Sequence, residues 1–167
     1  ASAREMGYLQ KKNIITGIEK EIQEMWYSGE LVKVFIEGIE GDYYAMPEGM
    51  EGPKATSSKV HILSPFDNFV IQRQKLQRFF DFDYQIECYV PERKRKYGYF
   101  TLPVFQGAKA LGRIDCKVDR TEKVVSVQSL HCEHNFDKDW LKSKMTSKLR
   151  SFVKFNNCTD LEYSSGC

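Results

Sequence analysis

The clearest alternation of hydrophobic and polar positions lies in residues 13–27. Apolar side chains recur there at intervals of three and four residues, beginning with Ile14, Ile15 and Ile18, and glutamates and lysines occupy the other positions. This period predicts an amphipathic helix. Gly29 follows where a left-handed cap would end such a helix.

Two short strands are predicted after this helix. Residues 31–36 form the first, the glycine-bearing stretch 37–42 forms a turn, and residues 43–46 return antiparallel. Residues 1–12 could supply a preceding helix and turn. Helix, strand, glycine-bearing loop and strand are the second half of a winged helix, although any αββ unit has the same order. We therefore predict a winged-helix unit over residues 1–50, truncated at its N-terminus within a longer parent chain.

A second unit is predicted over residues 59–167. Gly, Pro and Ser are frequent before it, which indicates a linker at 51–58. We expect a short strand at 60–63 and then a helix that follows the Ser64-Pro65 turn and continues to residue 80.

Most of the remainder of the second unit is predicted to form strands. Strands are expected at 84–90, 97–105, 108–118 and 123–131, with a tight hairpin at Gln106-Gly107. The stretch 135–137 offers caps for a last helix that carries Trp140 to Val153. The second unit should be a mainly antiparallel sheet or partly closed barrel flanked by helices, and the whole chain an α+β protein.

Composition restricts the function less than the pattern does. The sequence has 25 Lys and Arg against 23 Asp and Glu, a net charge of +2, so an affinity for nucleic acid must come from local clusters of charge. No apolar run approaches the roughly 20 residues of a membrane span. Five irregularly spaced cysteines predict reduced thiols in a soluble, cytoplasmic protein.

The strongest local signal for an anionic partner is the run Arg93, Lys94, Arg95 and Lys96, followed by aromatic Tyr97. A loop of this kind can neutralise phosphates and stack on bases. The alternative is a solvated turn that protects the rim of the sheet.

A second signal is the alternation of Arg113, Asp115, Lys117 and Asp119, which places four charges on one face of a strand. That face could meet a phosphate backbone, or it could be an ordinary polar face with cross-strand ion pairs. Lys11 and Lys12 precede the first long helix, where a phosphate contact or a solvated helix start would both fit.

Metal, cofactor and nucleophile chemistry find little support in these residues. The stretch 131–134 contains two histidines, a cysteine and a glutamate, but they are contiguous and no second ligand pair has suitable spacing. We predict no metal and no cofactor. No phosphate-binding glycine loop or nucleophile motif is present in the sequence, so no catalytic residue is assigned.

Several separated stretches together resemble one known family. Residues 63–73, 76–84, 87–99 and 112–120, with Leu102-Pro103 between them, are similar to the C-terminal half of bacterial winged-helix DNA glycosylases of the AlkZ/YcaQ type. The resemblance implies tandem winged-helix modules joined to a β-barrel-like domain, which together form a basic DNA-binding surface. Family members cleave N-glycosidic bonds to excise alkylated bases or to unhook interstrand cross-links.

The family's catalytic Gln-x-Gln or Gln-x-Asp pair lies in an N-terminal winged helix that we expect to be missing here. Gln72-Arg73-Gln74 has the same letters but lies in a predicted helix. Side chains two residues apart there point about 200° away from each other, so the two amides could not jointly hold a water molecule.

The resemblance and the charge pattern together give two groups of candidate residues. The predicted DNA-binding residues are Lys11, Lys12, Arg93, Lys94, Arg95, Lys96, Tyr97, Arg113, Lys117 and Arg120. A structural polar network is predicted for Asp67, Asn68, Arg73, Asp115 and Asp119.

The leading hypothesis is the DNA-binding C-terminal portion of a bacterial DNA-repair glycosylase. Its partners would be double-stranded DNA and the N-terminal modules of the parent chain, and on its own it would release no base. The rival is a non-enzymatic winged-helix regulator or interaction module. A small-molecule hydrolase that uses the aspartate-rich strand ranks last.

Overall fold

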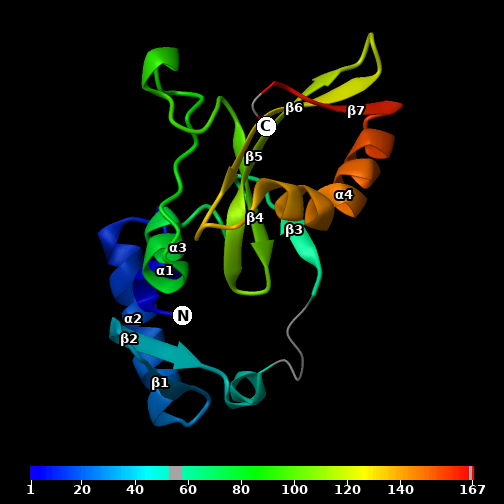
Figure 1. Ribbon diagram of the computed structural model, residues 1–167. Helices are drawn as coiled ribbons and strands as arrows, with labels where there is room; N and C mark the ends of the chain where they lie inside the picture. The colour runs from blue at the N-terminus through cyan, green and yellow to red at the C-terminus, as the bar shows by residue number, and fades with distance from the viewer. Residues whose placement is uncertain (53–57, 166) are drawn as a thin grey trace. The chain divides into compact units, whose positions relative to one another are not determined.

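The computed structural model describes residues 1–52, 58–165 and 167. The chain divides into two compact units, Ala1–Thr56 and Ser57–Cys167. The described residues form four α-helices, a two-stranded sheet and a curled five-stranded sheet, which confirms the predicted α+β class (Figure 1). Most of the linker predicted at 51–58 falls on residues 53–57, which lie outside the described residues.

The first unit contains two helices and a hairpin. The helices are α1 (Ala3–Met6) and α2 (Lys12–Tyr27), and the hairpin joins β1 (Val32–Ile36) to β2 (Ile39–Ala45) before a short 3₁₀ turn at Pro47–Glu51. The amphipathic helix therefore forms where the apolar spacing predicts it. The hairpin turn is shorter than the predicted 37–42, because Gly38 adopts a φ of +75° that allows a tight reversal.

The second unit is built on one sheet whose strands lie in the order β3-β4-β5-β6-β7. The strands are β3 (Val60–Ile62), β4 (Thr101–Gln106), β5 (Lys109–Asp119), β6 (Val124–Cys132) and β7 (Asp160–Tyr163). All neighbours pair antiparallel except β6 and β7, which are parallel. The parallel connection runs through helix α4 (Lys138–Phe155), the kind of crossover that parallel pairing requires.

Three predictions about the elements of this unit are wrong. Residues 84–90 form no strand, and the strand predicted at 97–105 begins only at Thr101. Tyr84 instead directs its hydroxyl inward, where it donates a 2.7 Å hydrogen bond to the Thr101 carbonyl. The helix expected directly after Pro65 is confined to α3 (Arg73–Phe80), because Asp67 closes a turn by accepting a 2.8 Å hydrogen bond from the Phe69 amide.

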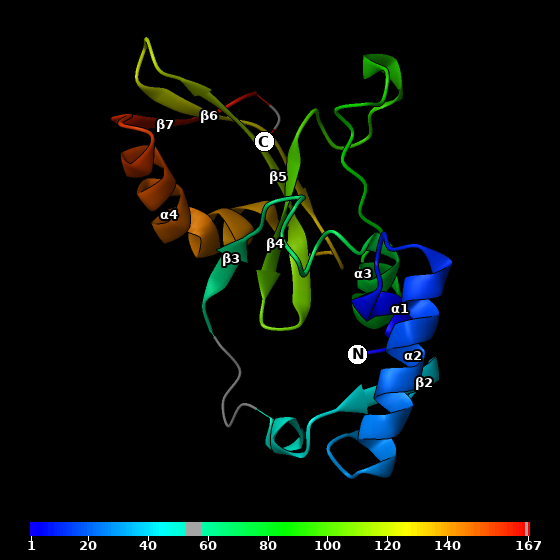
Figure 2. The same cartoon turned by 180° about the vertical axis from the view of Figure 1, so that it is seen from behind.

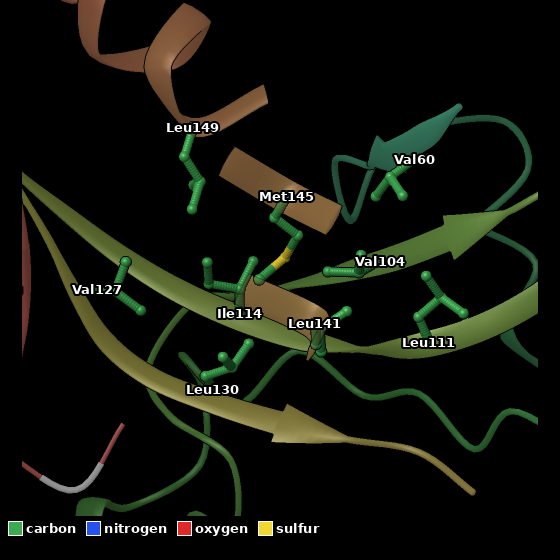
Figure 3. Packing of buried hydrophobic residues seen from close by; sticks show 9 residues of the cluster. All are labelled: Val60, Val104, Leu111, Ile114, Val127, Leu130, Leu141, Met145 and Leu149. Atoms are coloured by element: carbon green, nitrogen blue, oxygen red, sulfur yellow. The ribbon is translucent and has the colours of Figure 1, made fainter. Parts of the chain in front are cut away.

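Opposite faces of the sheet carry separate hydrophobic cores. Leu141, Met145 and Leu149 follow one another at intervals of four along α4 and pack on one face, as Figure 3 shows. The other face is covered by the segment that includes α3, and its core contains Leu76, Phe82 and Phe105, among other residues. Figure 2 shows α4 and α3 on opposite sides of the sheet.

A β-bulge in β6 decides which side chains reach the second face. Asp115 pairs with Ser129 and Cys116 pairs with Val127, so Gln128 is the extra residue. The bulge shifts the alternation, which leaves Val127 and Leu130 in the α4 core and places Ser129 beside Asp115 on the other face. The second face therefore has, beside its hydrophobic core, a polar face formed by β5 and β6, where Asp115 and Ser129 are neighbours.

Candidate nucleic-acid interface

An open groove of about 750 Å³ lies along this polar face. One wall is the loop that precedes β4, and the other is formed by β5 and β6. The lining residues include three cations, three aromatic rings and, besides Ser129, two further polar side chains of β6. They are Arg95, Lys96, Lys117, Tyr97, Tyr99, Phe100, Gln128 and His131.

A buried carboxylate fixes the first half of the loop. Glu87 is 6% exposed and accepts hydrogen bonds from three consecutive backbone amides, those of Lys96 (2.9 Å), Tyr97 (2.7 Å) and Gly98 (3.1 Å). Burial disfavours its charge and is the largest single influence on its pKa. The amides and the nearby Arg113 guanidinium together outweigh burial, so the pKa of Glu87 lies below its ordinary value.

A second carboxylate fixes the other half. Asp115 accepts hydrogen bonds from the amides of Tyr99 (2.6 Å) and Phe100 (3.1 Å), and the Ser129 hydroxyl donates to the Tyr97 carbonyl. The chain passes so close that a Cβ on Gly98 would lie 2.6 Å from an Asp115 oxygen, and the φ of Gly98 is +145°. The loop can close on Asp115 only because residue 98 is a glycine.

Arg113 lies beneath the loop rather than in the groove. Its side chain is 2% exposed, and its Nε and Nη2 donate to one oxygen of Glu133 at 3.0 and 2.7 Å. The guanidinium carbon lies 3.9 Å from the ring centroid of Tyr97 and 4.6 Å from that of Phe82. The assignment of Arg113 to DNA contact is therefore corrected, because the stacked rings and the ion pair leave it no surface for a ligand.

The remaining cations of the loop and strand reach solvent. Arg95 is oriented by a 2.9 Å hydrogen bond from its Nε to the Val90 carbonyl and lies 4.9 Å from the centre of the Tyr99 ring. Lys96 and Lys117 are exposed and form no ion pair within the described residues. The groove therefore presents positive charge that is not neutralised by its own carboxylates.

Other predicted cations are exposed but do not line this groove. Arg93 and Lys94 lie on a short 3₁₀ turn (Glu92–Lys94), and Arg120 lies in the turn between β5 and β6. In the first unit, Lys11 is the N-cap of α2 and Lys12 its first residue, both exposed. Their contact with DNA stays a prediction.

The predicted polar network is divided among separate turns. Asp67 binds the Phe69 amide, Asp115 binds the loop, and Asp119 accepts hydrogen bonds from the amides of Thr121 and Glu122. Asn68 and Arg73 are exposed. The three aspartates thus each organise backbone amides locally, and no hydrogen bond between described residues joins them to one another.

Two titratable groups of the groove stay uncharged at neutral pH. Burial, followed by the positive charges of Lys138 and Arg113, lowers the pKa of His131 below its ordinary 6.5. Burial also raises the pKa of the Cys116 thiol to about 12, so this cysteine is not a thiolate nucleophile. No group of three or more metal-capable side chains occurs in the parts of the chain that the structure describes.

A family model described as DNA glycosylase AlkZ-like matches residues 2–153. The chain belongs to this family. The DNA glycosylase AlkZ of Streptomyces sahachiroi is a similar solved structure, with a TM-score of 0.49 and 12% sequence identity. The match covers 98% of this chain and 41% of that one. The predicted resemblance to AlkZ-like glycosylases is confirmed, and the family match includes the first unit as well as the groove.

Two carboxylates of this AlkZ-like chain were not among the predicted site residues. The sequence places Glu87 in a predicted strand, and Glu133 in the contiguous stretch 131–134, for which no metal site is predicted. The available signal for Glu87 was a single acid in an otherwise uncharged run, Tyr84 to Val90, close to four consecutive cations. Nothing in the local sequence of Glu133 indicates its ion pair with Arg113.

Within residues 1–52, 58–165 and 167, no helix has the length and apolar character of a membrane span.

Proposed function

We propose that the groove of the second unit binds the phosphate backbone of duplex DNA, as part of a DNA-repair glycosylase. The observation that carries this proposal is the pair of exposed cations Lys96 and Lys117 on opposite walls of a groove that also holds aromatic rings, neither of them in an ion pair with a described residue. Cations bind phosphates by displacing condensed counterions, and rings give sugars and bases a surface on which to pack.

The acidic groups nearby do not cancel this charge. The carboxylates of Glu87 and Asp115 are turned toward backbone amides, which neutralise part of their field. Asp115 and Glu92 are the two acids that line the groove, and Glu92 precedes Arg93 and Lys94 on the same turn. The loop and the adjacent strand together carry an excess of positive charge toward solvent.

We also propose that residues 1–50 act as a winged-helix unit. The observed order α1, α2, β1, β2 supports this interpretation, with β1 and β2 as the wing. In that arrangement Lys11 and Lys12 would meet a phosphate at the start of α2.

We propose that this chain is the DNA-binding C-terminal portion of a longer glycosylase. Base excision would then depend on residues outside this chain. Gln72 and Gln74 support this division, because Gln72 is the N-cap of α3 and Gln74 its second residue. Side chains two residues apart on a helix point in different directions, so the amides of Gln72 and Gln74 do not hold one water molecule together. The chain should release no base from alkylated duplex, and measurable release would contradict the division.

The binding proposal is tested by the salt dependence of duplex affinity. The double variant Lys96→Gln and Lys117→Gln should reduce the slope of log affinity against log salt by about 2, roughly 0.9 for each lost phosphate contact. The control is Lys109→Gln, an exposed cation at the start of β5 that lies outside the groove and has its Nζ 4.7 Å from the centre of the Phe136 ring. An unchanged slope in the double variant would contradict the assignment of this groove to DNA.

A further inference from the structure

Helix α4 carries a concentration of positive charge that the groove does not use. Between Asp139 and Asp160 the sequence contains no carboxylate. The same stretch contains five cations: Lys142, Lys144, Lys148, Arg150 and Lys154. In a chain with a net charge of only +2, this is a large excess of positive charge for one helix.

Most of these cations are free to meet an external anion. Lys142 is used internally, with its Nζ 3.2 Å from Asp139 and 5.2 Å from the centre of the Tyr163 ring. Lys144, Lys148, Arg150 and Lys154 are exposed and make no ion pair with any described residue.

The helical period gathers these four cations on the outward half of α4. The inward stripe is Leu141, Met145, Leu149 and Val153 at intervals of four, all buried against the sheet side. At 100° per residue, the four cations flank a stripe of exposed serines, which consists of Ser143, Ser147 and Ser151. Small serine side chains leave room for a phosphate backbone to approach the helix between the cations.

One end of this surface is hollowed. A depression of about 860 Å³ lies between α4 and β7 and is lined by Arg150 and Lys154 together with polar Thr146, Asn157 and Thr159. No acid is among the described residues that line it. Side chains alternate along β7, so Leu161 and Tyr163 are half-buried and line the depression, whereas Asp160 and Glu162 are exposed.

We propose that the outward surface of α4 is a second binding surface for duplex DNA, on the opposite side of the sheet from the groove. Adjacent residues of β5 show this separation, since Ile114 packs in the α4 core and Asp115 holds the groove loop. The 18-residue helix is about 27 Å long, close to the roughly 34 Å of one turn of DNA. Its charge and length therefore suit several phosphates of a second duplex segment.

This inference rests on the proposed function, namely that the chain binds DNA, and the two can be separated by experiment. The double variant Arg150→Gln and Lys154→Gln is compared with the groove variant Lys96→Gln and Lys117→Gln, using a duplex of about 30 base pairs, roughly three helical turns. Each pair should reduce the salt slope by about 2, and the four substitutions together by about 4, because distant sites act additively.

The outcomes distinguish the two surfaces. A slope that falls for the groove pair but not for the α4 pair overturns this inference and leaves the proposed function intact. A slope that falls for the α4 pair alone supports the inference and overturns the assignment of the groove. Lys109→Gln serves as the charge control, and an unchanged urea midpoint shows that each variant is folded.

Discussion

The basic loop at residues 92–100 and the basic helix α4 present positive charge by opposite means. After the 3₁₀ turn Glu92–Lys94, the backbone of the loop is held by two carboxylates, Glu87 and Asp115. In α4 the backbone satisfies itself, and the apolar stripe beginning at Leu141 fixes which side faces out. The position of the positive side chains in the loop therefore depends on acids elsewhere in the chain. In the helix their position depends only on the local spacing of apolar residues.

This difference predicts how each region responds to substitution. A change beneath the loop should disturb folding and the groove together. A change of one outward cation on α4 should alter the surface charge and leave folding nearly untouched. Four substitutions test this contrast, from the largest expected effect to the smallest.

Arg113→Ala should have the largest effect on stability. The substitution removes the guanidinium between the Tyr97 and Phe82 rings and leaves Glu133 without its partner. Loss of one member of a buried pair costs about 3 kcal/mol or more. Urea unfolding measures the change, with Lys117→Ala on the same strand face as an exposed control expected within about 0.5 kcal/mol. Equal effects for the two variants would contradict the buried role of Arg113.

Gly98→Ala should come next, at about 2 kcal/mol, because a strained backbone and a side-chain clash act at the same residue. The new Cβ would meet Asp115 and Ser129, 2.6 and 2.9 Å away. Gly49→Ala is the matched control, since a Cβ added there would have no atom within 4 Å and the φ of Gly49 is not positive. Unfolding of Gly98→Ala at the same urea concentration as the control would show that the close approach to Asp115 is not needed.

Glu87 should make the second unit sensitive to acid. Its pKa is lower in the folded chain than the ordinary 4.5, so its stabilising effect is complete above pH 4.5 and is lost as the pH falls through the folded value. Glu87→Gln should cost about 1 to 2 kcal/mol at neutral pH and flatten the loss of stability below pH 4.5. The exposed Glu162→Gln is the control, and parallel pH curves for the wild type and Glu87→Gln would refute the role.

Lys148→Ala should have the smallest effect on folding, within about 0.5 kcal/mol, since the side chain is exposed and its position is helical. Alanine also has the highest helix propensity, so the helix is not weakened. Thermal unfolding checks this directly. A large loss of stability would show that the charge of α4 is part of the fold and not a free surface.

The regular parts of the fold could be predicted because their signals are local. The stripe that begins at Leu141 and the alternation along 108–118 predict α4 and β5 closely. The irregular conformation of residues 84–90 could not be predicted from the local sequence. Glu87 accepts its hydrogen bonds from backbone amides about ten residues further along the chain. Strand β7 was not predicted from the sequence either, because it has only four residues and depends on its parallel pairing with β6.

The site was predicted in part for the same reason. Arg95, Lys96, Tyr97 and Lys117 line the groove as the cation run and the strand alternation suggest. The alternation also places Arg113 on the correct face, but it does not reveal burial. That depends on rings from two distant segments, Phe82 and Tyr97, closing over the guanidinium.

The most direct test of the central claim is to map where duplex DNA contacts the labelled chain by amide chemical shifts. Binding by the groove predicts the largest salt-sensitive changes at residues 95–100, at Lys117 and at 128–131. Changes confined to other parts of the chain, with these amides unaffected at saturating duplex, would contradict the account.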